Sequence, residues 1–144
     1  MTMKRIILSL LVFAALSHAS AQGVQSDIPT VVKNTFVTKF PKAVTPKWTH
    51  TKMTYEVQFM VGLSDHQATI DSLGNMVRHQ YEISSRSLPK VVNDNITKNH
   101  LDAKIENTEQ IDVGRTSTYV VQMRDASGVH KVTFNQEGKE ISSK

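Results

Sequence analysis

A twenty-residue pattern occurs twice in this chain and limits what the chain can fold into. Tyr55–Gly74 and Tyr119–Gly138 share a tyrosine, a valine, a glutamine, a threonine and a glycine at a constant offset of 64 positions. Within both stretches, apolar and polar residues alternate with the two-residue period of a β-strand. A glycine closes each stretch, where a hairpin turn needs a residue that tolerates positive φ. The pattern therefore predicts two copies of one strand-and-turn unit.

The similarity extends back to a predicted helix before each copy. Ile28-Pro29 and Val31-Val32 match Leu88-Pro89 and Val91-Val92 at an offset of 60 positions. Proline suits the first turn of a helix, where its missing N–H would have no partner. The apolar residues that follow recur at three- and four-residue steps, which places them along one side of a helix. Because valine, threonine and asparagine are weak helix formers, we expect each helix to depend on packing against a sheet.

These observations predict an α+β fold made of two tandem repeats, one over about residues 26–86 and one over about residues 87–144. Each repeat would be a helix followed by an antiparallel β-meander, with both helices packed on one face of the sheet. The predicted strands are residues 47–52, 54–61, 66–71 and 76–84 in the first repeat, and residues 104–113, 117–124, 129–135 and 139–142 in the second. Alternation places their apolar residues on the helix side and leaves the polar face in contact with water.

The first 21 residues have the organisation of a signal peptide. Lys4 and Arg5 form a positive start, Ile6–Leu16 is apolar, and Ala19-Ser20-Ala21 is a cleavage site of small residues. The apolar run is well short of the roughly 20 residues that span a bilayer. We predict a mature domain of residues 22–144 that is periplasmic or secreted and that inserts into no membrane after cleavage.

Composition and motifs argue against several classes of function. The chain has no cysteine, which excludes disulfide and thiolate chemistry. Without Lys4 and Arg5, its 17 basic residues fall to 15 against 13 acidic ones, and they form no run that would bind nucleic acid. No serine has the surroundings of a nucleophile elbow, and no glycine-rich loop could cradle a phosphate. The sequence therefore predicts a protein that is not an enzyme, without catalytic residues and without a cofactor.

His66 and His79 fall on neighbouring predicted strands. If the hairpin closes with Ile70 opposite Asn75, the two imidazoles lie opposite each other on one face of the sheet. A stable zinc site usually needs three or four ligands, and no carboxylate occupies an obvious third position. We therefore predict no metal site. Clustered histidines would instead favour a small-ligand or metal-binding periplasmic protein, which is the alternative to the function predicted below.

A set of short motifs occurs in the same order in both halves of the chain. These motifs are Ile28–Val32, Phe36–Ala43, Lys47-Trp48, Tyr55–Val57 and Ile70–Gly74, followed by Leu88–Val92, Tyr119–Val121 and Phe134–Gly138. The second copy departs from the first at His100-Leu101, where the first has Phe40-Pro41. Over nearly all of residues 22–144, this order resembles the PepSY-like family of bacterial envelope proteins, which are similar in fold to the β-lactamase inhibitor protein (BLIP). The resemblance implies a two-repeat protein of the periplasm or the extracellular space, without enzymatic activity.

The polar face of the predicted sheet is the candidate binding surface. Its side chains offer directional hydrogen bonds and soft apolar contacts, which suit protein docking better than capture of a small molecule. The candidate partner-binding residues are Glu56, Gln58, Met60, Arg78, Gln80, Val120, Gln122 and Arg124. We therefore predict an exported protein-binding module that inhibits or modulates an envelope protein. Self-association through an exposed edge strand is a further alternative, and a monomer is favoured over it.

Overall fold

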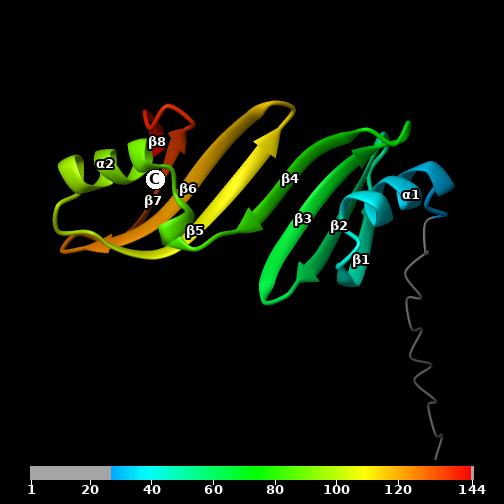
Figure 1. Ribbon diagram of the computed structural model, residues 1–144, viewed down its shortest axis with the longest axis horizontal. Coiled ribbons are helices and arrows are strands. Elements are labelled where there is room, and N and C mark those ends of the chain that lie inside the picture. The colour runs from blue at the N-terminus through cyan, green and yellow to red at the C-terminus, as the bar shows by residue number, and fades with distance from the viewer. Residues whose placement is uncertain (1–26, 144) are drawn as a thin grey trace, which may run out of the picture.

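Eight β-strands form one antiparallel sheet in which every strand pairs with the next one along the chain (Figure 1). The computed structural model describes residues 27–143, so the predicted signal peptide lies outside the described residues. The strands are β1 (Val44–His50), β2 (Thr54–Val61), β3 (Ser64–Asp71), β4 (Met76–Glu82), β5 (Lys104–Val113), β6 (Thr116–Asp125), β7 (Gly128–Asn135) and β8 (Glu140–Ser143). Helix α1 (Thr30–Lys39) precedes β1, while a 3-10 turn (Ser85–Ser87) and helix α2 (Lys90–Asn99) connect β4 to β5. None of the described helices is long and apolar enough to cross a membrane.

The predicted division into two tandem helix-plus-meander repeats, with helices packed on one face, is wrong. β4 pairs with β5 from His79 opposite Asp112 to Glu82 opposite Glu109, so all eight strands belong to one continuous sheet. The two helices have only ten residues each, and most of the described chain is strand. Residue alternation cannot reveal this arrangement, because it shows which face a side chain occupies but not which strand lies alongside.

β1 and β8 are the two edges of the sheet. β1 begins at Val44, three residues before the predicted start, and it includes Pro46. An edge strand tolerates proline because the missing N–H can lie on the solvent side, which allows β1 to include Pro46. A register shift between Val44 and Lys47 interrupts the pairing with β2 at the same place. Proline, lysine and irregular pairing are features that discourage edge-to-edge association.

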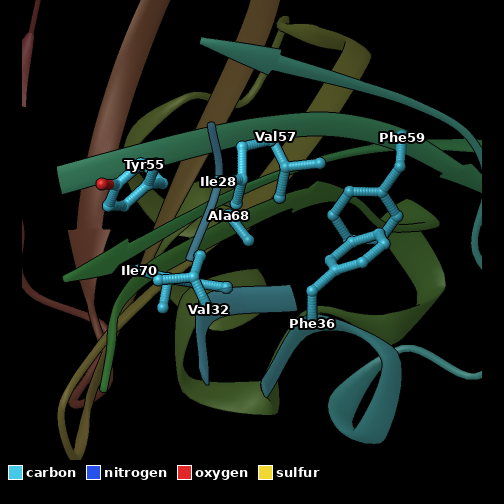
Figure 2. Packing of buried hydrophobic residues seen from close by; sticks show 8 residues of the cluster. All are labelled: Ile28, Val32, Phe36, Tyr55, Val57, Phe59, Ala68 and Ile70. Atoms are coloured by element: carbon cyan, nitrogen blue, oxygen red, sulfur yellow. The ribbon is translucent and has the colours of Figure 1, made fainter. Parts of the chain in front are cut away.

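Each helix buries apolar side chains in a hydrophobic cluster. Cluster one comprises Ile28, Val32, Phe36, Tyr55, Val57, Phe59, Ala68 and Ile70 (Figure 2). Cluster two comprises Leu88, Val92, Ile96, Tyr119, Val121, Met123, Val132 and Phe134. In cluster one, the rings of Phe36 from α1 and Phe59 from β2 meet edge to face, with centroids 5.0 Å apart. Burial of this kind stabilises helices that are too short and too rich in weak helix formers to persist alone.

A glycine turn lies against each helix. Gly74 has a φ of +87°, and Thr35 Oγ1 of α1 donates a hydrogen bond of 2.7 Å to its carbonyl oxygen. Gly138 has a φ of +79°, and Asn95 Nδ2 of α2 donates a hydrogen bond of 3.0 Å to its carbonyl oxygen. A Cβ atom added at Gly138 would lie 2.5 Å from the carbonyl oxygen of Val91. The turn before β8 therefore needs glycine both for its φ and for its close approach to α2.

Thr108 of β5 carries a buried hydroxyl group. Its exposed fraction is 2%, and its Oγ1 has no hydrogen-bond partner among the described residues. We expect Thr108→Val to stabilise the fold by about 1 kcal/mol, because it replaces an unpaired buried hydroxyl with a methyl group. Urea unfolding followed by circular dichroism measures this change. Thr49→Val, at an exposed position of β1, is the control, and a lower midpoint for Thr108→Val would contradict the expectation.

Candidate functional site

The eight predicted partner-binding residues lie on one face of the sheet, which we call the open face. Glu56, Gln58 and Met60 alternate along β2, Arg78 and Gln80 along β4, and Val120, Gln122 and Arg124 along β6. Residues paired directly across neighbouring strands point to the same face. Gln58, Gln67 and Gln80 are paired in this way, and Gln80 is paired in turn with Ile111 of β5. Cluster one and cluster two occupy the opposite face, because their strand residues alternate with these positions.

Cross-strand hydrogen bonds hold the carboxylates of the open face in place. Gln67 Nε2 donates to Glu56 Oε2 at 3.3 Å, and Gln80 Nε2 donates to Glu109 Oε2. This second bond joins β4 to β5 at the centre of the sheet. Sequence reasoning named Gln80 but missed Glu109, because the register between β4 and β5 decides which acceptor the amide meets.

A further carboxylate joins β5 to β6. Glu106 accepts hydrogen bonds from Arg124 Nε at 2.5 Å and from Gln122 Nε2 at 3.2 Å. These two bonds, with that of Arg124 the stronger, hold the pKa of the Glu106 carboxyl group below its ordinary value. Gln122 and Arg124 are therefore oriented by a glutamate that the sequence analysis did not include among the candidates.

The open face contains an open hollow of about 440 Å³. Its lining comprises Thr45, Lys47, Gln58, Phe59, Met60, Asp65, His66, Gln67, Gln80, Tyr81, Glu82 and Glu109. Glu82 and Glu109 are paired across β4 and β5, where like charges repel each other. Lys47 is the only lysine or arginine of this lining, so carboxylates are in excess. A hollow with these properties can accept a projecting polar or cationic side chain better than it can enclose an apolar ligand.

The two histidines singled out in the sequence meet on the opposite face. A register shift in β3 and β4 places Ile70 opposite Met76, so His66 lies opposite Tyr81 and not opposite His79. The imidazoles nevertheless touch diagonally, with His66 Nδ1 and His79 Nε2 3.0 Å apart. The predicted pair therefore exists, although the predicted register of the hairpin is wrong.

The histidine pair belongs to a set of stacked rings at the end of α1. Tyr81 stacks on His79 with centroids 4.5 Å apart, and Phe59 stacks on His66 at 5.2 Å. Phe40, directly after α1, lies 4.8 Å from the His79 ring. Within residues 27–143, no group of three or more histidine, aspartate or glutamate side chains could hold a metal ion. The pair thus offers two nitrogen ligands at most.

Burial dominates the proton affinity of both imidazoles. It lowers the pKa of His79 to about 4, with a smaller contribution from His66 in the same direction and an opposing one from Asp112. Burial also lowers the pKa of His66, and the neighbouring Asp65 opposes this shift. Both rings are therefore neutral at pH 7, and one of the two nitrogens in contact donates the hydrogen bond that the other accepts.

Comparison with solved structures gives the fold of this chain a wider context. No family model matches the chain, and no curated protein matches it either. A DUF2874 family protein from Bacteroides uniformis has a TM-score of 0.68 at 17% identity, covering 81% of this chain and 88% of its own. A protein from Bacteroides eggerthii, which bears a provisional name as a periplasmic protein, has a TM-score of 0.68 at 15% identity. The match covers 81% of this chain and 87% of that protein. A BLIP-like protein from Bacteroides fragilis has a TM-score of 0.66 at 14% identity and covers 81% and 84%.

At such identities the similarity establishes the fold and nothing more. The predicted likeness to the BLIP fold is confirmed, since one of the similar structures is BLIP-like. Membership of the PepSY-like family stays a prediction. The chain therefore has the fold that these DUF2874 family and BLIP-like structures from Bacteroides share.

Proposed function

We propose that this protein is a binding module of the bacterial envelope that docks a partner protein on its open face and so inhibits or modulates it. The observation that carries the proposal is the row of Gln58, Gln67 and Gln80 across three strands. Amide groups that lie side by side on paired strands present hydrogen-bond donors and acceptors to a partner from a rigid backbone, unlike amide groups on a flexible loop. Cross-strand carboxylates at Glu56 and Glu109 fix two of these amides, which lowers the entropy lost on binding.

Two further observations support a place outside the cytoplasm. The N-terminal sequence has the features of a signal peptide, and one similar structure bears the provisional name of a periplasmic protein. We place the mature chain, from Gln22 onward, in the periplasm or outside the cell, and we assign it no catalytic activity.

Affinity capture from an envelope extract tests the proposal. The bait is the mature chain, residues 22–144, and the test variant combines Gln58→Arg with Arg124→Glu on the open face. We expect one protein to be captured by the wild type and its affinity for the variant to fall at least tenfold, which corresponds to about 1.4 kcal/mol. The matched control, Lys33→Glu, changes an exposed residue of α1 away from the open face. Equal capture by all three baits would show that the open face is not the docking surface.

A further inference from the structure

The stacked rings join the end of α1 to three strands through the histidine pair. Phe40 follows α1 directly, Phe59 lies on β2, His66 on β3, and His79 and Tyr81 on β4. Within this set of rings, His66 Nδ1 and His79 Nε2 form a hydrogen bond of 3.0 Å. Such a bond needs one protonated and one unprotonated nitrogen at the contact. A doubly protonated pair would bring two N–H groups and two positive charges face to face.

Among the described residues, no charged group forms an ion pair with His66 or His79 that would stabilise a second proton. Lys39 of α1 and Asp112 of β5 both line a hollow of about 630 Å³ together with His79, so charges of both signs lie near this ring. Asp112 faces His79 across β4 and β5, but its Oδ1 already accepts hydrogen bonds from Gln110 and Ser117.

Neither imidazole has a counter-ion in contact. Asp65 is the chain neighbour of His66, and Tyr81 contributes a phenol. Within the described residues, no carboxylate forms an ion pair with His66 or His79. A proton added to this pair would therefore place a half-buried positive charge among aromatic rings without a contact partner.

Two other histidines, near the end of α2, have the opposite environment. His100 Nε2 lies 3.4 Å from Glu140 Oε2, and His130 Nε2 lies 3.7 Å from Asp125 Oδ2. Each of these imidazoles thus has a carboxylate within ion-pairing distance, whereas no such ion pair forms at His66 or His79 among the described residues.

We propose that the His66–His79 pair is an acid-sensitive latch, which holds the end of α1 on β3 and β4 at neutral pH and releases it on acidification while cluster two stays folded. A compartment that follows the external pH would make such a latch respond to the surroundings of the cell. The proposal does not rest on the identity of a partner at the open face, although His66 and Tyr81 also belong to the lining of the hollow there.

The pKa directions agree with this geometry. The pKa of His79 is about 4 in the folded chain, below its ordinary value of 6.5, so the folded state binds fewer protons than the unfolded state between these pH values. The stabilisation is therefore complete above pH 6.5 and is lost as the pH falls toward 4. His66 acts in the same direction, and the two protons belong to the pair as a whole.

Trp48 is a suitable reporter, because it is the only tryptophan of the chain and its ring packs against Phe36 of α1 at 5.2 Å. We expect its fluorescence in the mature chain to shift as the pH falls from 7 to about 4, while amide NMR signals of β6 and β7 stay in place. In His79→Gln, which keeps polar atoms but cannot titrate, the midpoint should move by at least one pH unit. His100→Gln, at the end of α2, should leave the Trp48 transition unchanged.

The imidazole carbon and proton NMR signals of the wild type provide a readout that depends on no variant. The latch predicts that both His66 and His79 titrate below the ordinary imidazole pKa of 6.5, over the same range as the Trp48 transition. A Trp48 signal that stays flat down to pH 4 would overturn the proposal. So would a Trp48 transition that occurs while both imidazoles remain neutral.

Discussion

Gly138→Ala should unfold a large fraction of the molecules under mild denaturant. Its φ of +79° costs an alanine about 1–2 kcal/mol. The new Cβ would also lie 2.5 Å from the carbonyl oxygen and 2.7 Å from the carbonyl carbon of Val91, which are backbone atoms of α2. Helix and turn must then separate, and the hydrogen bond from Asn95 to Gly138 is strained with them. We expect a loss of about 2–5 kcal/mol in the free energy of unfolding, measured by urea titration with circular dichroism.

Alanine variants of two further glycines distinguish the cost of backbone strain from the cost of steric overlap with a helix. Gly114 has a φ of +61°, and no atom lies within 4 Å of its added Cβ, so Gly114→Ala should cost only the backbone term of about 1–2 kcal/mol. At Gly74 the nearest atom is the side-chain Cγ2 of Val31, at 2.7 Å, while the nearest backbone atom is 3.3 Å away, so the alanine variant should fall between the other two. The predicted order of stability is Gly114→Ala, then Gly74→Ala, then Gly138→Ala. Equal losses in the free energy of unfolding for Gly114→Ala and Gly138→Ala would show that close packing of α2 against the Gly138 turn does not contribute to stability.

Phe134→Ala should have an effect of similar size by a different route. Phe134 is completely buried in cluster two, with an exposed fraction of 0%. Removing its ring leaves a cavity between β7 and α2, and Phe→Ala substitutions in cores cost about 3–5 kcal/mol. Urea unfolding measures the loss, and the Trp48 fluorescence reports whether cluster one unfolds in the same transition.

Leu63→Ala is the matched control for the loss of a large apolar side chain. Leu63 lies in the turn between β2 and β3, and 96% of its surface is exposed. Its substitution should change the free energy of unfolding by no more than about 0.5 kcal/mol. A small loss at Phe134 would mean that cluster two repacks around the missing ring.

The β-strand alternation was the most reliable guide to the core. It placed Tyr55, Val57, Tyr119 and Val121 on the apolar face, and all four are buried. It failed for Val77, which it placed in the core but which is 41% exposed. The register shift between β3 and β4 explains the error, because it changes the parity of the residues next to it. A strand pattern predicts the side of each residue only as long as the strand stays regular.

The candidate surface could be predicted in part for the same reason. Alternation along single strands is enough to bring Gln58, Gln80 and Gln122 to one face. It cannot show that Glu109 and Glu106 accept their hydrogen bonds, because those contacts depend on the register of strands that are distant in sequence. The contact of His66 with His79 was predicted by a register that proved incorrect, since side chains of this length also reach their diagonal neighbours.

The order of the strands has a consequence for how the chain folds. Because every strand pairs with its neighbour in sequence, most of the sheet can form from hairpins with short turns, which cost little loop-closure entropy. Only the pairing of β4 with β5 must close over a longer connection, residues 83–103, which contains α2. That pairing also opposes Glu82 and Glu109. We therefore expect the hairpins on both sides to form early, and the closure of β4 on β5 to be the slow step that makes one sheet out of them.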